Sequence, residues 1–129
     1  MQLLLATLFL VACSTEEPPT LGTLIINSVS SDAIRCSVAV IGADPVDYGF
    51  YYATSKSEAE KATANKVKGT YDSSNINGSI ERLTPNTVYY IRAYAMNVSG
   101  RAYTKTIEVR TMTRAPESND NKYPNIVFK

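Results

Sequence analysis

The sequence contains no histidine and no tryptophan, and it has only two cysteines among its 129 residues. The absence of histidine removes the commonest general base and the commonest metal ligand of proteins. The sequence also has no glycine-rich phosphate loop, no His/Cys cluster with metal-ligand spacing and no Ser-His-Asp set. These absences predict a protein that is not an enzyme and that uses no metal or other cofactor.

Charge is sparse and nearly balanced. Thirteen Lys and Arg residues stand against twelve Asp and Glu residues, which gives a formal net charge of +1. No basic stripe offsets a phosphate backbone, so nothing in the charge pattern predicts nucleic acid as a partner. The densest acidic pair, Glu58 and Glu60, has Lys56 and Lys61 beside it and indicates a solvated, charge-balanced surface turn.

Hydrophobic residues and tyrosines are abundant instead. Hydrophobic residues make up 44% of the chain, and nine residues are tyrosines. A chain of this length has room for one domain of ordinary size, and its composition is normal for a globular core. Large aromatic rings suit a pleated, half-buried surface, so the composition favours β structure.

The N-terminal residues contain a short apolar run, Leu3–Ala12. Ten residues rise about 15 Å as a helix, which is half of a bilayer core, so the run is too short to span a membrane. It has the length of the hydrophobic region of a signal peptide. Met1 and Gln2 before it carry no Lys or Arg, so either the true start lies upstream or the signal is atypical.

The end of this run, Leu10-Val11-Ala12-Cys13, resembles the lipobox of bacterial lipoprotein precursors. The resemblance implies that the thiol of Cys13 receives a diacylglycerol lipid and that residues 1–12 are removed as a signal peptide. Two alternatives remain open at this point. The run can be an ordinary hydrophobic leader followed by a chance cysteine, or Cys13 can form a disulfide with Cys36.

Residues 13–21 are expected to form the lipidated cysteine and an extended linker that does not pack, because the stretch is acidic and contains two prolines. Glu16 and Glu17 also resemble a surface-export signal of lipoproteins in some Gram-negative bacteria, although a solvated linker explains them equally well. The expected location is the outer membrane, with the protein lipid-anchored and exposed at the cell surface. The domain is expected at 22–112, followed by a polar tail at 113–129.

Between Leu21 and Thr111 the sequence consists of short alternating runs separated by turn residues, which is typical of an all-β sandwich. In the second run alternate residues from Ile34 to Val40, including Cys36, are expected to share the buried face. Ser55 and Glu58 form a capping-box pattern, which predicts one or two helical turns at the surface. The strands are expected at 23–30, 33–41, 46–54, 65–71, 76–82, 87–96 and 101–111.

The stretch from Leu83 to Asn97, followed by Gly100, Tyr103 and Val109, resembles the last two strands of a fibronectin type III domain, in the variant common in bacterial surface lipoproteins. The resemblance implies an immunoglobulin-like antiparallel β-sandwich of about seven strands. It also implies that Tyr89 is the tyrosine-corner residue, with its hydroxyl bonded to backbone near Leu83. The sequence departs from the family in lacking its usual core tryptophan and in carrying the helical insertion.

A candidate binding patch follows from the alternation of the strand at 87–96. If alternate residues from Tyr89 to Ala95 point into the core, then Tyr90, Arg92 and Tyr94 point outward, and Tyr51 is expected beside them on the same face. Tyrosine and arginine together can stack on sugar rings or anchor a protein partner. Ordinary cross-strand packing on a sheet surface produces the same pattern.

The sequence therefore predicts a membrane-anchored envelope protein with an adhesion, spacer or glycan- or protein-contact module. Two alternatives stay open: an anchored N-terminal fragment of a larger carbohydrate-active enzyme, and a subunit of a surface assembly. The apolar segment 123–128 is compatible with the start of a further domain or with an edge strand added to a sheet. The oligomeric state is left open.

Overall fold

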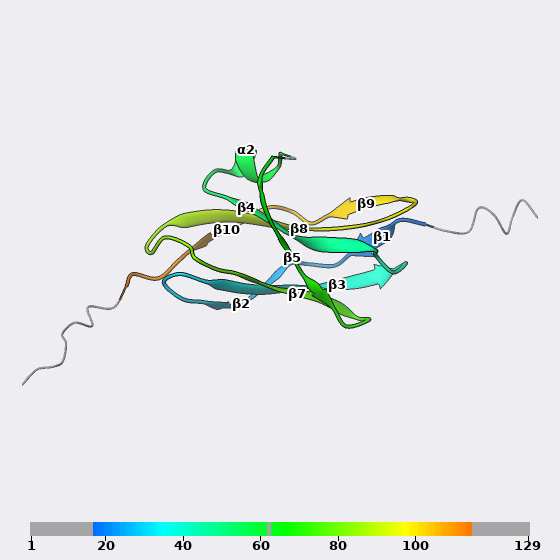
Figure 1. The fold of residues 1–129 in the computed structure, drawn as a ribbon, viewed down its shortest axis with the longest axis horizontal. Coiled ribbons are helices and arrows are strands. Elements are labelled where there is room, and N and C mark those ends of the chain that lie inside the picture. The colour runs from blue at the N-terminus through cyan, green and yellow to red at the C-terminus, as the bar shows by residue number, and fades with distance from the viewer. Residues whose placement is uncertain (1–16, 62, 115–129) are drawn as a thin grey trace, which may run out of the picture.

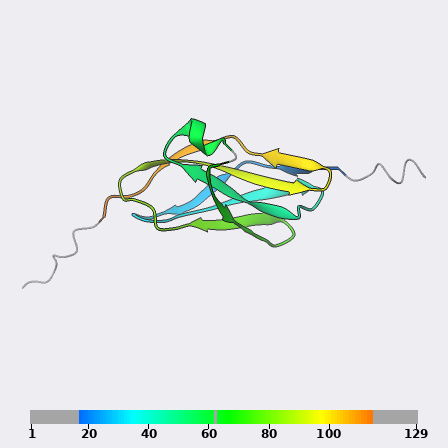
Figure 2. The same ribbon diagram turned by 45° about the horizontal axis from the view of Figure 1, so that its top comes forward.

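The computed structural model describes residues 17–61 and 63–114. The predicted signal peptide, Cys13 and the segment 123–128 lie outside the described residues. The described chain forms two antiparallel sheets that pack face to face, and it enters and leaves the sandwich at opposite ends (Figures 1 and 2). The predicted all-β sandwich is confirmed.

The first sheet is built around its longest strand, β3, which pairs on both sides. Two short strands, β1 and β2, pair with one side of β3, and β7 pairs with the other and carries β6. The bounds of these strands are Pro19–Leu21 for β1, Ile25–Val29 for β2, Ile34–Gly42 for β3, Thr70–Tyr71 for β6 and Asn75–Ile80 for β7.

The second sheet is built in the same way around β8. On one side β8 pairs with β4, which carries β5, and on the other side it pairs with β9 and β10 in succession. The bounds are Asp47–Ala53 for β4, Asn65–Lys68 for β5, Val88–Asn97 for β8, Gly100–Tyr103 for β9 and Ile107–Arg110 for β10.

The linker ends earlier than the sequence predicts. Residues 13–21 were expected not to pack, but Pro19–Leu21 is strand β1 and pairs with the end of β3. Proline is compatible with the first position of an edge strand, where its missing N–H leaves no ladder bond unmade. Leu21 also packs against the hydrophobic core, which favours the ordered strand. The linker prediction is wrong for these three residues.

Two of the expected strands are each broken in two. Gly69 separates β5 from β6 and lets the chain cross from the second sheet to the first. A Cβ at Gly69 would lie 2.6 Å from Cγ2 of Ile76, so the crossing requires glycine. Between β9 and β10, the Oγ1 atom of Thr104 accepts a hydrogen bond from the N–H of Ala93 at 2.9 Å. A side chain thus replaces one bond of the backbone ladder, and the strand is interrupted there.

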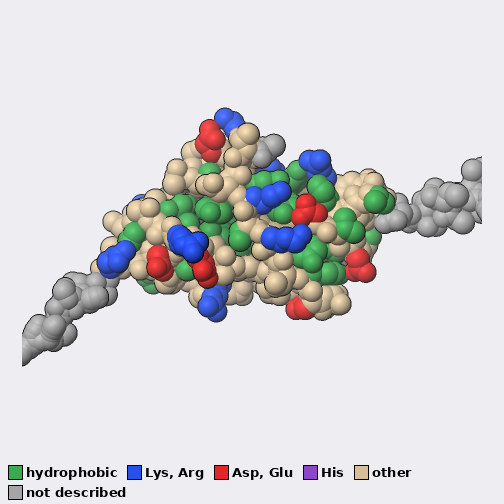
Figure 3. Space-filling view, in the orientation of Figure 1, with side chains coloured by type: hydrophobic (Ala, Val, Ile, Leu, Met, Phe, Trp, Pro, Cys, Tyr) green, Lys and Arg blue, Asp and Glu red, His purple; other side chains and the backbone are tan. Residues whose placement is uncertain are grey.

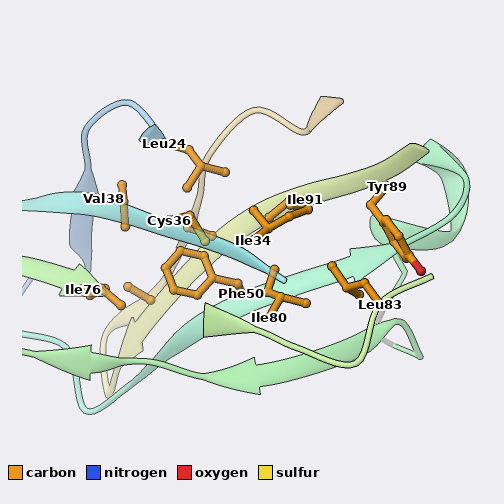
Figure 4. Packing of buried hydrophobic residues seen from close by; sticks show 12 residues of the cluster. Leu24, Ile34, Cys36, Val38, Phe50, Ile76, Ile80, Leu83, Tyr89 and Ile91 are labelled. Atoms are coloured by element: carbon orange, nitrogen blue, oxygen red, sulfur yellow. The ribbon is translucent and has the colours of Figure 1, made fainter. Parts of the chain in front are cut away.

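The core lies between the two sheets and is centred on Phe50, which is 0% exposed (Figure 4). Ile34, Cys36 and Val38 are buried together on the inner face of β3, as the alternation predicts, and Val40 is half-buried. Cys36 has a free thiol in the described structure, and Cys13, the alternative disulfide partner, lies outside the described residues. Burial raises the pKa of this thiol to about 12, so it is neutral at physiological pH.

The helical insertion is a single turn, α2, from Lys56 to Ala59. The Oγ atom of Ser55 accepts a hydrogen bond from the N–H of Glu58 at 3.2 Å, so the predicted cap is confirmed. Ala59 is 0% exposed, however, so the turn packs onto the domain and does not stand free at its surface. No helix within residues 17–61 and 63–114 is long and apolar enough to cross a membrane.

Candidate contact face

The outer face of the second sheet, the side that does not meet the first sheet, brings together aromatic rings and cations from four strands. Cross-strand partners lie on the same face of a sheet, so the register identifies which side chains share it. We call this surface the contact face, and its members are Tyr51 of β4, Lys66 and Lys68 of β5, Arg92 and Tyr94 of β8, and Arg101 and Tyr103 of β9.

The three tyrosines of the contact face form one cluster. The ring centroids of Tyr51 and Tyr94 are 4.9 Å apart, and those of Tyr51 and Tyr103 are 6.5 Å apart. The rings are tilted by 43° and 41° to each other, and their separations fall within the range of about 4.5–7 Å that is typical of interacting aromatic pairs. The hairpin joining β8 to β9 creates this cluster, because its register places Tyr103 directly opposite Tyr94.

Two cations lie over these rings. The guanidinium carbon of Arg92 is 4.0 Å from the ring centroid of Tyr103 and 5.4 Å from that of Tyr51. The Nζ atom of Lys66 is 5.3 Å from the ring centroid of Tyr94 and 5.9 Å from that of Tyr51. These distances are within the range of cation–π attraction, which holds the cations at defined positions on the sheet.

The segment with the helical insertion contacts the contact face at Arg92. The Nη2 group of Arg92 donates a hydrogen bond to the backbone carbonyl of Glu60 at 3.1 Å. The carboxylate of Glu60 in turn accepts a hydrogen bond from Oγ1 of Thr106 at 2.5 Å. The Nε atom of Arg92 is buried without a hydrogen-bond partner in the described structure. Arg92 is therefore positioned by stacking and by one backbone contact.

Tyr94 lies on the contact face, as the alternation predicts, but it is only 4% exposed. Its hydroxyl donates a hydrogen bond to Oδ1 of Asp47 at 3.2 Å, and Asp47 also lies 3.5 Å from Nζ of Lys68. Burial, and secondarily the Asp47 carboxylate, raises the pKa of the Tyr94 phenol, which keeps it protonated. Tyr94 is thus the buried member of the contact face, and neighbouring side chains cover its ring.

The predicted patch of Tyr51, Tyr90, Arg92 and Tyr94 is brought together in part. Tyr51 contacts both Arg92 and Tyr94, whereas Tyr90 lies opposite Ala53 and Glu108 toward the end of β8 where that strand begins. Within the described residues, Tyr90 has no ring contact with the tyrosine cluster.

Sequence reasoning did not place Tyr103 or Lys66 in this patch. Tyr103 is the most exposed ring of the cluster at 41%, and it follows a two-residue turn that fixes its register with Tyr94. The signal for it was present, because the pairing of Asn97 with Gly100 determines which residue of β9 faces Tyr94. The pairing of Lys66 with Tyr51 depends on the β4–β5 register, which follows a loop with the helical insertion.

On the core side of β8, Tyr89 is buried between the sheets (Figure 4). Its hydroxyl oxygen accepts a hydrogen bond from the backbone N–H of Thr84 at 2.8 Å, one residue after Leu83. This bond ties the loop that precedes β8 to the strand itself and so fixes where β8 begins. Among the described residues no group of three or more His, Cys, Asp or Glu side chains could hold a metal ion.

No protein-family model matches the sequence, and no curated protein matches it. Solved structures match it at the level of the fold. The sixth fibronectin type III domain of human fibronectin type III domain containing protein 3 has a TM-score of 0.57 at 17% identity, over 82% of this chain and 96% of that one. The fibronectin type III domain of human collagen alpha-1(XX) chain has a TM-score of 0.52 at 18% identity, over 81% of this chain and 90% of that one. The domain is fibronectin type III-like.

A third structure holds the FN1–FN3 domains of chicken CNTN1, with a TM-score of 0.53 at 22% identity. The match covers 73% of this chain and 32% of that longer fragment. At these identities the likeness concerns the fold alone.

Proposed function

We propose that this chain is a lipid-anchored protein of a bacterial outer membrane, exposed at the cell surface, whose fibronectin type III-like domain makes non-catalytic contacts with glycans through the contact face. The observation that carries the proposal is the cluster of Tyr51, Tyr94 and Tyr103 with cations stacked on it. Rings held at fixed spacing on a rigid sheet lose little entropy when they bind a partner.

The position of the anchor supports this use of the face. Five residues, 14–18, separate Cys13 from Pro19, where β1 begins, so the tether can extend about 20 Å at most. The described chain enters at one end of the long axis of the sandwich, whereas β4, β8 and β9, which carry the contact face, run along its length (Figure 1). A domain tethered by that end leaves its side free for other molecules.

The anchor is tested by a Cys13→Ala variant of the full chain in a bacterial host that processes lipoproteins. We expect the variant to remain unprocessed or to be released from membranes, because its only acceptor for the lipid is removed. The measurement is acyl mass on the purified protein together with membrane fractionation. Cys36→Ala is the matched control and should keep its lipid, since that thiol is buried in the core. A Cys13→Ala protein that stays membrane-bound, with no acyl mass on the unmodified chain, would contradict the anchor.

The contact function is tested on a glycan array probed with the full chain in detergent micelles. We expect Tyr103→Ser to lose most of the signal on every glycan that the unmodified chain binds, because Tyr103 is the exposed ring of the cluster. Ile25→Ser is the matched control, since Ile25 is an exposed apolar residue at 53% on the other sheet. Its signal should be unchanged. The absence of signal on all glycans, or equal losses in the two variants, would contradict glycan contact through this face.

A further inference from the structure

The contact face is more positively charged than the chain as a whole. Four cations lie on it by register, Lys66, Lys68, Arg92 and Arg101, against the single carboxylate of Asp47. They leave a net charge of +3 on the face, although the whole chain has a formal charge of only +1. Figure 3 shows Lys and Arg side chains gathered between α2 and β9, with an acidic side chain among them.

The acidic groups near the face are already engaged or lie at its margin. Asp47 accepts the hydroxyl of Tyr94 and lies beside Lys68, and the carboxylate of Glu60 accepts the hydroxyl of Thr106. Glu108 lies opposite Tyr90, beyond the tyrosine cluster. Lys66, which lies opposite Tyr51, and Arg101, which contacts the hydroxyl of Tyr103, are in contrast exposed to solvent and pair with no carboxylate in the described structure. An anionic partner would therefore meet uncompensated positive charge here.

We propose that the ligand of the contact face is an acidic polysaccharide, whose pyranose rings stack on Tyr103 and Tyr51 while its carboxylate or sulfate groups pair with the surrounding cations. This inference rests on the proposed function and specifies its ligand. Along one row across the strands, Lys66 and Arg92 flank Tyr51, each about 4.8 Å away in strand spacing. A chain that alternates ring faces with acidic groups matches this alternation of ring and charge.

The sheet topology favours a polysaccharide over an extended acidic peptide. A peptide commonly binds a sheet by adding a strand to its edge, where backbone groups are free. Tyr51 and Tyr94 stand on β4 and β8, which are each paired on both sides, whereas Tyr103 stands on β9, which pairs with β8 alone. The backbone groups of β4 and β8 are therefore used, and over these two strands a ligand can reach only side chains. Flat rings and fixed cations suit a polymer recognised by stacking and charge.

The test measures binding of the full chain in detergent micelles to polygalacturonate, a polymer of pyranose rings with one carboxylate each. Its fully methyl-esterified form has the same rings without the charge and is the matched ligand control. Poly-glutamate provides the charge without the rings. We expect polygalacturonate to bind, with affinity falling as NaCl is raised, and the methyl ester and poly-glutamate to bind on the order of 10-fold more weakly.

Two double variants test whether the cations of the contact face are the ones that bind the polymer. Lys66→Gln/Arg101→Gln should bind polygalacturonate on the order of 10-fold more weakly while its melting temperature is nearly unchanged, because both side chains are exposed. Arg35→Gln/Arg114→Gln removes the same charge from exposed positions outside the face and should bind as the unmodified chain does.

Several results would overturn the inference. Equal affinity for polygalacturonate and its methyl ester would show that the carboxylates do not contribute to binding. Equal affinity for poly-glutamate would show that the sugar rings do not contribute. Equal loss of affinity in the two double variants would show that the binding site lies outside the contact face. Failure to bind polygalacturonate also overturns it. If the array shows neutral glycans bound through Tyr103 while polygalacturonate fails, the proposed function stands and only the acidic ligand is wrong. If no glycan binds at all, both fail.

Discussion

Replacing Phe50 by alanine is expected to lower the free energy of unfolding by about 3–5 kcal/mol, measured by urea denaturation. Phe50 is fully buried at the centre of the core, between the two sheets. Its removal takes away the burial of a whole aromatic ring and leaves a cavity that paired strands on both sides cannot collapse to fill. Ile25→Ala, at an exposed position, should change stability by less than about 0.5 kcal/mol and is the control.

A second substitution makes this prediction sharper. A Cβ built on Gly78 of β7 would lie 2.5 Å from Cε2 and 2.7 Å from Cδ2 of Phe50, so glycine at this position makes room for the ring. Gly78→Ala alone should therefore destabilise the domain by about 1–3 kcal/mol through overpacking. In the Phe50→Ala background the same change should be nearly neutral or stabilising, because the new methyl group enters the cavity. Additive effects in the double variant would show that Gly78 is not needed to make room for the Phe50 ring. A loss of unfolding free energy below about 1 kcal/mol for Phe50→Ala alone would contradict the described core.

Replacing Gly49 by alanine is expected to destabilise the domain by about 1–3 kcal/mol or more. Gly49 lies in the middle of β4, and a Cβ there would be 2.2 Å from the backbone oxygen of Val67 and 3.0 Å from Cα of Lys68. These are backbone atoms of the neighbouring strand, so no side-chain rotation relieves the contact. The pairing of β4 with β5 would have to open, which would also displace Lys66 from Tyr51.

Gly22→Ala is the matched control for this change. A Cβ at Gly22 would lie 3.5 Å from Cβ of Ala39, which is an ordinary contact. Because alanine restricts the unfolded chain more than glycine does, this variant should be neutral or more stable by about 0.4–1 kcal/mol. The two alanine variants should therefore shift the urea midpoint in opposite directions or by very different amounts. Equal midpoints would show that β5 does not approach β4 as closely as described.

Local chemistry was sufficient to predict several elements of the fold. The alternation of Ile34, Cys36 and Val38 identified both a strand and its buried face, because side chains in a strand alternate with a period of two. Ser55 and Glu58 identified the start of the helical turn, since a cap involves only residues within one turn of each other. The turn after Asn97 was predictable for the same reason.

Features that depend on which segments meet were missed or only partly predicted. The crossing at Gly69 and the interruption at Thr104 are set by contacts with Tyr48 and Ala93, which lie 21 and 11 residues earlier in the chain. Pro19–Leu21 forms a strand because the end of β3 is available to pair with it. None of these partners can be read from the segment itself.

The sequence alone therefore determined the β-sandwich, the phase of its strands and the sheet face on which Tyr51, Arg92 and Tyr94 lie, because alternation and turn geometry act over a few residues. Only the tertiary structure decided what that face presents. It buried Tyr94 beneath its neighbours, added Tyr103 and Lys66 through strand register, and left Tyr90 apart from the cluster. Register and burial are set by packing between distant segments, and the exposure of an outward side chain depends on what the neighbouring strands place around it.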